Sequence, residues 1–326
     1  MLPNLLNYEI TNLALWQGRH DSLPEERFFQ RVQCIDIHTH SFDNTQQQPM
    51  IVGFCSDEGI RRNEGRTGAR TGPDNIREQL AKLACHTNTT YLDAGNIVCE
   101  DEKLEAAQLE LAKLIEYCHR QGHRTIVLGG GHEIAWGHFC GLAARYPKLG
   151  IINFDAHFDI RPVHQIRLGT SGTPFWQIKH YCQQHERSFD YCCLGIQEAA
   201  NTKSLFELAH EWGIAYLTVD QLQTQDHNEK IAFLDAFLTH HEHIYLTICL
   251  DVFAECYAPG VSAPQALGLA PQTALPLLKY IMQTGKVVSL DLAELSPPLD
   301  QGHKTSRLAA SMLAQLLSVN NHKEPS

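Results

Sequence analysis

The feature that most constrains this chain is a regular alternation of short apolar runs with longer amphipathic stretches. The short runs are four to seven residues long and rich in β-branched and aromatic residues, which is typical of strands. Apolar positions recur at helical spacing in the stretches between them. This alternation favours an α/β fold, a three-layer α/β/α arrangement with a central, mostly parallel sheet.

The expected strands span Met50–Cys55, Arg124–Leu128, Gly150–Phe154, Tyr191–Gly195, Ala215–Thr218, Ile244–Leu250 and Lys286–Leu290. The expected helices span Asp74–Ala84, Glu102–Gln121, Glu133–Tyr146, Thr202–Glu211, Asn228–Thr239, Ala270–Thr284 and Thr305–Leu317. No repeat, low-complexity tract or Pro/Ser-rich linker divides residues 1–326, so we expect a single domain whose first ~45 residues form an extension or an edge segment.

Polar residues follow several of the expected strands directly. Gly129–Glu133 comes after one strand and Asp155–Asp159 after the next, and Asp251 and Asp291–Glu294 mark the ends of two later strands. Ligands of open parallel sheets bind beyond the carboxyl ends of the strands. We therefore expect these carboxylates and imidazoles to meet along one rim of the sheet.

Asp155, His157 and Asp159 alternate with apolar residues, so in an extended chain their side chains share one face. A mixed set of oxygen and nitrogen ligands suits Mn²⁺, Fe²⁺ or Zn²⁺ better than Ca²⁺. The alternative is a capped strand end with a hydrogen-bonded histidine.

The run Gly129–Gly131 permits a tight turn before His132. It lacks both the P-loop pattern and the Gly-x-Gly-x-x-Gly spacing, so nucleotide binding is not expected. His132 is then either a metal ligand at a helix start or an incidental histidine after a glycine turn.

The charge balance excludes some partners. There are 26 basic and 37 acidic residues, a net charge of −11, which argues against binding to nucleic acid or to an anionic membrane. No apolar run reaches the ~18–20 residues of a membrane span, and the first 20 residues do not resemble a signal peptide. Eleven scattered cysteines indicate reduced thiols, so we expect a cytoplasmic protein.

Four ordered motifs resemble those of the ureohydrolase family, which includes arginases, agmatinases and formimidoylglutamases. Leu128-Gly-Gly-Gly-His-Glu133 is similar to the first metal motif and Asn153-Phe-Asp-Ala-His-Phe-Asp159 to the second. The third, Asp-x-Asp before a Pro-Gly segment, matches Cys249-Leu-Asp251 before Ala258-Pro-Gly260, and the fourth matches Asp291-Leu-Ala-Glu294. The resemblance implies an arginase-like fold from about Ile51 to Ala310.

Within this family the chain most resembles the formimidoylglutamases, through Gly53–Arg66, Gly72-Pro73 and Thr170–Phe175. Phe175 stands where arginases carry a histidine, which argues against an arginase. The resemblance implies hydrolysis of N-formimidoyl-L-glutamate to L-glutamate and formamide in histidine degradation. An agmatinase or a guanidino-acid hydrolase is the alternative of the same fold.

The resemblance also implies a site that holds two divalent ions, Mn²⁺ first, and activates a bridging water. Asp159 would move the proton, Glu294 would hydrogen bond the cationic end of the substrate, and the loop with Gly172 and Thr173 would line the substrate mouth. A homo-oligomer acting on a small molecule is typical of the family. The implied metal ligands are His132, Asp155, His157, Asp159, Cys249 and Asp251.

Cys249 departs from the family pattern, because it occupies the place of the first aspartate of Asp-x-Asp. A thiolate there would be a soft ligand that favours Zn²⁺ or Fe²⁺ over Mn²⁺, whereas an uncoordinated thiol would leave one ion weakly held. The remaining interpretation is a non-catalytic relative that binds metal.

Two further clusters need an interpretation. Asp36-Ile-His-Thr-His40 imitates the first metal motif of TIM-barrel amidohydrolases, but the later strand ends do not continue that pattern, so we interpret His38 and His40 as surface or packing residues. Arg61, Arg62 and Arg66 are hypothesised to bind the two carboxylates of the substrate, since guanidinium groups pair with carboxylates in bidentate fashion.

Overall fold

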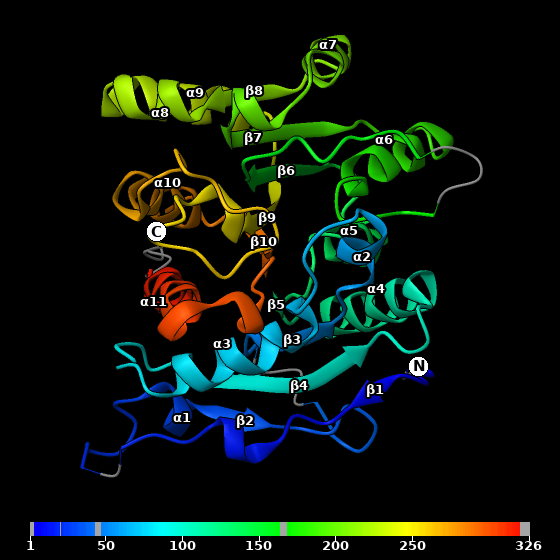
Figure 1. Ribbon diagram of the computed structural model, residues 1–326. Helices are drawn as coiled ribbons and strands as arrows, with labels where there is room; N and C mark the ends of the chain where they lie inside the picture. The colour runs from blue at the N-terminus through cyan, green and yellow to red at the C-terminus, as the bar shows by residue number, and fades with distance from the viewer. Residues whose placement is uncertain (1–2, 20, 43–46, 164–167, 320–326) are drawn as a thin grey trace, which may run out of the picture.

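The computed structural model describes residues 3–19, 21–42, 47–163 and 168–319. Within them ten strands form one sheet in the order β1-β4-β3-β5-β10-β9-β6-β7-β8, and β2 also pairs with β4 (Figure 1). All strand pairs are parallel except β1 with β4. The strands are β1 Tyr8–Glu9, β2 Val32–Cys34, β3 Met50–Cys55, β4 Tyr91–Val98, β5 Thr125–Leu128, β6 Leu149–Phe154, β7 Asp190–Ile196, β8 Ala215–Thr218, β9 His243–Cys249 and β10 Val287–Ala293.

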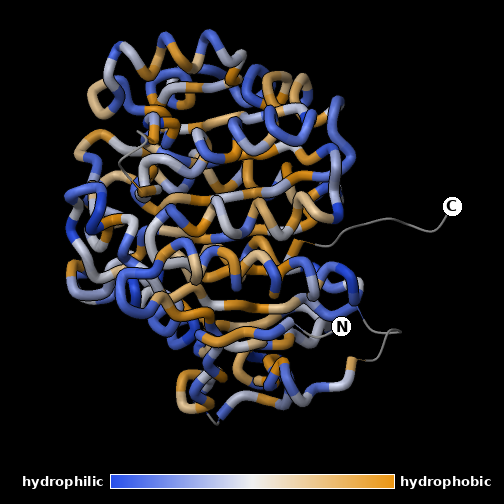
Figure 2. The backbone as a smooth tube through the Cα atoms, turned by 90° about the vertical axis from the view of Figure 1, so that its right-hand side faces the viewer, coloured by the Kyte–Doolittle hydropathy of each residue, from blue (hydrophilic) through white to orange (hydrophobic). Residues whose placement is uncertain are grey.

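Helices cover both faces of the sheet, as expected for a three-layer α/β/α fold (Figure 1). The helices are α1 Phe28–Arg31, α2 Glu58–Arg62, α3 Gly72–Ala81, α4 Leu104–Arg120, α5 Ile134–Ala143, α6 Pro174–Gln184, α7 Lys203–Glu211, α8 Val219–Thr224, α9 His227–Leu238, α10 Pro271–Gln283 and α11 Lys304–Leu317. One face packs against α3 and α8 to α11, and the other packs against α4 to α7. Figure 2 shows apolar residues concentrated along the strands in the middle of the molecule.

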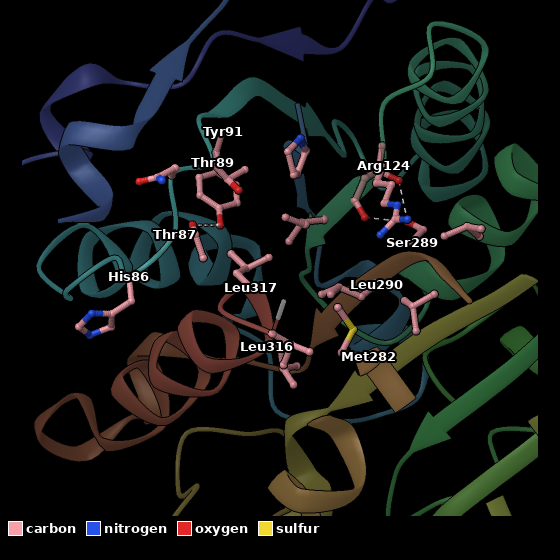
Figure 3. A pocket seen from close by; sticks show the side chains of 17 residues that line it. His86, Thr87, Thr89, Tyr91, Arg124, Met282, Ser289, Leu290, Leu316 and Leu317 are labelled. Atoms are coloured by element: carbon pink, nitrogen blue, oxygen red, sulfur yellow. Dashed lines mark hydrogen bonds between the residues drawn. The ribbon is translucent and has the colours of Figure 1, made fainter. Parts of the chain in front are cut away.

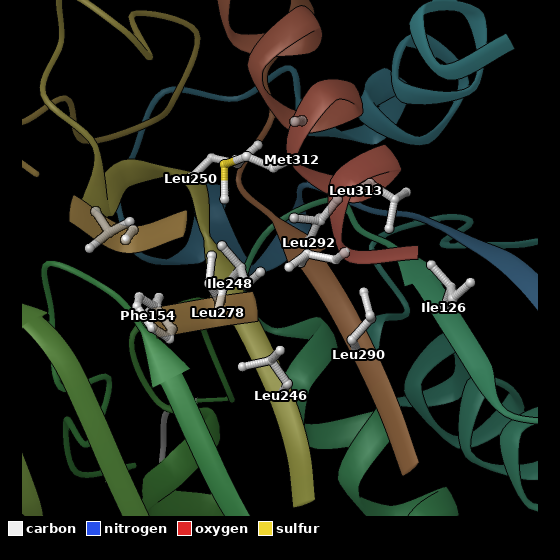
Figure 4. Close-up of a cluster of buried hydrophobic side chains, with 14 of the residues drawn as sticks. Ile126, Phe154, Leu246, Ile248, Leu250, Leu278, Leu290, Leu292, Met312 and Leu313 are labelled. Atoms are coloured by element: carbon white, nitrogen blue, oxygen red, sulfur yellow. The ribbon is translucent and has the colours of Figure 1, made fainter. Parts of the chain in front are cut away.

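The central strands are apolar on the face that meets α10 and α11. Leu246 and Ile248 of β9, and Leu290 and Leu292 of β10, are buried there against residues such as Leu278 (Figure 4). Burial of each such side chain is worth about 1.5–3 kcal/mol. This apolar layer fixes the register of the strands, because a one-residue slip would turn these side chains to the opposite face.

The seven expected strands and seven expected helices are all present, with ends shifted by up to three residues. Four helices and three strands were not expected from the sequence, namely α1, α2, α6, α8, β1, β2 and β4. β4 contains Asp93, Gly95 and Asn96, residue types that are depleted in strands. The expectation that Asp291 ends its strand was wrong: β10 continues to Ala293, so Asp291 lies inside the sheet and is fully buried.

Asp93 explains how the N-terminal segment joins the sheet. Its carboxylate pairs with fully buried Arg77 of α3, through Nε at 2.8 Å and Nη2 at 2.9 Å. It also accepts hydrogen bonds from Thr11 Oγ1 at 2.8 Å and from Trp16 Nε1 at 2.7 Å. Residues before position 47 therefore supply donors to a buried charge on β4, while β1 and β2 extend the sheet at this edge.

None of the helices in the described ranges is both long and apolar enough to span a bilayer. His38 and His40, in the segment after β2, contact Tyr8 and Phe42 and lie outside the polar cluster at the strand ends. Their interpretation as surface or packing residues agrees with these contacts.

Candidate metal centre

The carboxyl ends of β5, β6, β9 and β10 bring their polar residues to one small cavity of about 100 Å³. It is lined by Asn63, His132, His157, Asp159, Arg161, Ser171, Cys249, Asp251, Ser262, Ala263 and Glu294. The expectation that several strand ends converge on one rim is thus met by residues from four different strand ends.

Two groups of metal-ligating atoms lie in this cluster. One consists of His132, Asp155 and Cys249, the other of Asp155, His157 and Asp251, and within each group the ligand atoms lie within 4.8 Å of one another. Asp155 belongs to both groups, which is the arrangement of a carboxylate shared by two neighbouring ions.

The internal contacts of the cluster fit cation binding. His132 Nδ1 lies 2.9 Å from an oxygen of Asp155 and 2.9 Å from Asp159 Oδ2, and His157 Nδ1 lies 3.1 Å from Asp251 Oδ2. The buried Oδ1 of Asp251 has no hydrogen-bond partner among the described residues. The donor set consists of three carboxylates, two imidazoles and one thiol, and one carboxylate oxygen is buried without a partner. Such a set suits divalent transition-metal ions.

The pKa shifts within the cluster also fit the binding of a cation. Burial and the neighbouring Asp155 raise the pKa of Asp159 to about 6, and burial with nearby Asp251 raises the pKa of Glu294 well above its ordinary value. Burial would lower the pKa of His132, but its hydrogen bonds to Asp155 and Asp159 raise that pKa well above its ordinary value. The raised pKa values of the two carboxyl groups and of His132 reflect an excess of buried acidic groups, and a bound cation would relieve that excess.

The loop after β5 places His132 by a close approach of two backbones. A Cβ at Gly130 would lie 1.7 Å from Ser56 O, so a side chain cannot be accommodated there. His132 N donates to Glu294 Oε1 at 2.8 Å, and Glu294 N donates back to Gly130 O at 2.8 Å. These two bonds fasten the ends of β5 and β10 together and hold the Glu294 carboxylate at the cavity wall.

Asp159 and Glu294, the two residues expected to be catalytic, share an uncommon backbone conformation. Their φ angles are 48° and 73°, in the left-handed region that non-glycine residues rarely adopt. Such strain costs of order 1–3 kcal/mol and concentrates at functional sites.

A larger cavity of about 610 Å³ adjoins the cluster and shares Asn63 and Arg161 with it. Arg61, Arg62 and Thr173 line this larger cavity. Both guanidinium groups are already paired: Arg61 Nε lies 2.6 Å and Arg62 Nε 2.7 Å from the carboxylate of Glu58.

Further contacts engage Arg61 and Arg62, and other partners engage Arg66, the third arginine that was expected to bind the substrate. Arg62 Nη1 also lies 2.6 Å from Glu105, and Arg61 Nη2 lies 3.0 Å from Glu102. Arg66 lines neither cavity, because its guanidinium donates to the carbonyls of Val261 and Ser262. Through these bonds Arg66 holds the loop that carries Ser262 against the cavity.

Two other expected contacts lie in the loop before α6. Thr173 is only 4% exposed, and its hydroxyl forms hydrogen bonds with Thr170 and Gln177. The carbonyl of Gly172 accepts a hydrogen bond from Arg161 N at 3.0 Å. Phe175 packs edge-on against the His132 ring, with centroids 5.5 Å apart. This loop therefore forms the wall of the site beside His132.

Arg161, which was not among the residues expected from the sequence, lines both cavities and is exposed. No ion pair of its guanidinium occurs among the described residues. Arg161 lies two residues after Asp159, but β6 ends at Phe154 and Asp159 has a left-handed φ, so the period of a strand does not place Arg161 at the site. Asn63 and Ser171 were likewise not expected from the sequence.

The fold and this cluster together define a class: mostly parallel α/β proteins with paired metal-ligating groups at the carboxyl edge of the sheet. Comparison with known proteins makes the class specific. The Arginase family model matches residues 47–318, and the chain belongs to this family.

Relatives cover nearly the whole chain. A formimidoylglutamase of Legionella pneumophila (strain Lens) is 55% identical over 98% of this chain and 100% of the relative, and one of Clostridium tetani is 41% identical over 96% of each. Among solved structures, formimidoylglutamase of Bacillus subtilis has a TM-score of 0.78 at 21% identity and covers 92% of this chain and 93% of its own. Trypanosoma cruzi formiminoglutamase with Mn²⁺ has a TM-score of 0.77 at 24% identity and covers 90% and 97%.

Proposed function

We propose that the chain is a metal-dependent hydrolase that converts N-formimidoyl-L-glutamate into L-glutamate and formamide. The observation that carries the proposal is the pair of ligand groups that share Asp155, since this arrangement fits two adjacent divalent ions. The names of full-length relatives at 55% and 41% identity support the substrate. The metal ligands are His132, Asp155, His157, Asp159, Cys249 and Asp251.

Two bound divalent ions would lower the pKa of a water molecule towards ~7 and so supply a nucleophile for the formimidoyl carbon. The chain's own residues would do the rest. Asp159, 2.9 Å from His132 Nδ1, would take the proton of the attacking water and return it to the leaving amine. Glu294, fixed by the His132 amide, would hold the cationic formimidoyl end through its carboxylate.

The glutamate end of the substrate would lie in the adjoining cavity of about 610 Å³. We propose Arg161 as its principal carboxylate partner, because Arg61 and Arg62 are balanced by Glu58 and by further glutamates. Arg61, Arg62, Gly172 and Thr173 would then shape the cavity and its mouth. Agmatine carries no carboxylate, so it would gain nothing from Arg161.

For the metals we propose Mn²⁺ at both positions, with Fe²⁺ or Zn²⁺ as the alternative at the position that Cys249 shares with His132. One imidazole, one carboxylate and a thiol form that position, whereas the other has oxygen and nitrogen donors alone. A cytoplasmic location, assembly into a homo-oligomer and a place in histidine degradation stay predictions.

The test is release of glutamate and formamide by metal-stripped protein that is reloaded separately with Mn²⁺, Fe²⁺ or Zn²⁺. Agmatine and arginine serve as parallel substrates, Asp251→Asn as the site variant, and Asp190→Asn as the matched control far from the cluster. We expect turnover of formimidoylglutamate alone, lost in Asp251→Asn and kept in Asp190→Asn. Activity only on agmatine would favour an agmatinase, and metal binding without turnover would favour a non-catalytic relative.

A further inference from the structure

The centre of the sheet carries a buried polar stripe on the face opposite to the apolar layer of Figure 4. Central strands of parallel sheets are usually apolar on both faces, so the stripe is unusual. It lies under α5 and runs along three neighbouring strands. Its members are Thr125 of β5, Tyr245 and Thr247 of β9, and Ser289 and Asp291 of β10.

His138 of α5 closes this stripe from above and is fully buried. Its Nδ1 lies 2.6 Å from Asp291 Oδ2, and its Nε2 lies 2.6 Å from Ser289 Oγ. Asp291, His138 and Ser289 thus have the connectivity of a serine-hydrolase triad.

Ser289 also lines a cavity of about 710 Å³ at the amino ends of the strands, opposite to the acidic cluster (Figure 3). A nucleophile there is nevertheless excluded by its contacts. The Ser289 hydroxyl donates to Thr125 O at 2.9 Å and contacts Thr125 Oγ1 at 2.6 Å besides His138, so its one donor and two acceptor positions are taken. Ser289 is 2% exposed, which leaves no room for attack on a ligand.

The other end of the network leads to the candidate metal centre. Asp291 Oδ2 accepts a second hydrogen bond from Tyr245 OH at 2.5 Å. Burial and Asp291 raise the pKa of Tyr245 well above its ordinary value, and a hydrogen bond with Thr247 opposes that rise. Thr247 Oγ1 in turn lies 3.0 Å from His132 Nε2.

The orientation of His132 follows from this last contact. With Nε2–H donating to Thr247 Oγ1, Nδ1 is the ring atom that faces Asp155 and Asp159, each 2.9 Å away, and it would become the ligand atom when a metal ion replaces its proton. That is the tautomer that a metal ligand requires. Thr247 follows Tyr245 on the same face of β9 and lies opposite Asp291 of β10, so both residues flank the threonine whose hydroxyl oxygen accepts from His132.

We infer that His138 and Asp291 are positioning residues, which act through Tyr245 and Thr247 to hold His132 in the orientation and tautomer that bind a metal ion. The inference rests on the proposed function only in so far as His132 is a metal ligand. It predicts that metal affinity depends on a histidine of α5 that does not touch the metal centre.

The experiment measures the dissociation constant of Mn²⁺ by competition with a chelator, well below the unfolding temperature of each variant. Thr247→Val should weaken binding about 10–100-fold, the usual effect of losing the partner of a metal-ligating histidine, and His138→Phe should weaken it by about tenfold. His138→Asn should recover most of the loss, because its amide can donate to Asp291 from the place of Nδ1. At saturating Mn²⁺ the KM for formimidoylglutamate should stay unchanged.

His123→Phe is the matched control. His123 is 2% exposed and bonds to Gln48 O, outside the network, so the variant should lose thermal stability and keep its Mn²⁺ affinity. If His138→Phe also kept wild-type affinity and only unfolded at a lower temperature, the inference would be wrong. Should His138→Phe not fold, Asp291→Asn and Thr247→Val, which preserve side-chain shape, carry the same test.

The two proposals can fail separately. A wild-type protein that binds Mn²⁺ but does not hydrolyse formimidoylglutamate would refute the proposed function, while the affinities of the variants would still decide the role of His138.

Discussion

Replacing Cys249 by aspartate tests whether position 249 belongs to the metal centre. The Cys249 thiol is 1% exposed, and burial together with the carboxylates of Asp155 and Asp251 raises its pKa well above its ordinary value. In the metal-free protein it therefore adds no charge to the cluster. An aspartate would add one, at a position within 4.8 Å of the Asp155 oxygen.

The size of the effect follows from that distance. Two unit charges 4.8 Å apart repel each other by about 3.5 kcal/mol at an effective dielectric constant of ~20. Because 4.8 Å is the largest separation of these atoms, Cys249→Asp should lower the free energy of unfolding of the metal-free protein by about 3 kcal/mol or more, and by less where protonation relieves the repulsion. Saturating Mn²⁺ should remove the deficit, because the added carboxylate becomes a ligand that suits Mn²⁺ better than sulfur does.

The assay is chemical unfolding of wild type and Cys249→Asp with and without Mn²⁺. A second readout is the near-ultraviolet charge-transfer band of the Co²⁺-loaded protein, which requires a thiolate ligand. The band should vanish in Cys249→Ala and persist in Cys192→Ala, the control at a fully buried cysteine on the other face of the sheet. A band unaffected by Cys249→Ala would refute thiolate ligation, and a stability deficit of Cys249→Asp that persists at saturating Mn²⁺ would show that position 249 does not reach the metal.

Three further predictions concern other parts of the chain. Arg77→Met should lower the free energy of unfolding by about 3–5 kcal/mol, because it leaves the Asp93 carboxylate buried without its cation; a loss under about 1 kcal/mol in urea unfolding, as for a surface pair, would contradict this. Arg161→Met should raise the KM for formimidoylglutamate at least about tenfold in steady-state kinetics, the loss expected for one charged hydrogen bond, and an unchanged KM would assign the carboxylates to another residue. The hydrogen bond to Asp190 raises the pKa of His241 and lowers that of Asp190, so the stabilisation is present between about pH 4 and 6.5 and is lost as the pH rises through the raised pKa of His241. The difference in urea midpoint between wild type and Asp190→Asn should therefore shrink above that range, and a constant difference would speak against the pair.

The sequence could predict what depends on local pattern. The apolar runs of β9 and β10 predict strands, and the polar residues that follow them predict a site at the carboxyl edge of the sheet. The shared face expected for Asp155, His157 and Asp159 assumed an extended chain. In the structure β6 ends at Phe154 and Asp159 has a left-handed φ, so these residues meet through the turn of the loop and not through the period of a strand.

Other features depend on contacts between distant segments, which no local pattern reveals. Asp93, buried with Arg77, makes β4 polar in a way that resembles a loop, and its partners lie 16 and 82 residues away. Glu58 is what pairs with Arg61 and Arg62, so the arginine hypothesis overestimated their free charge. His138 looked like an ordinary helix residue, because its partner Asp291 lies 153 residues further along the chain.

The tie between Asp93 and the N-terminal segment bears on where the folding unit begins. The family model starts at residue 47, but a chain cut there would leave Asp93 without the Thr11 hydroxyl and the Trp16 indole. Arg77 would then face a carboxylate newly open to water beside the edge of the sheet. The stretch that the family model matches is therefore shorter than the stretch this chain needs to keep β4 covered, and a chain trimmed to residue 47 should aggregate through β4.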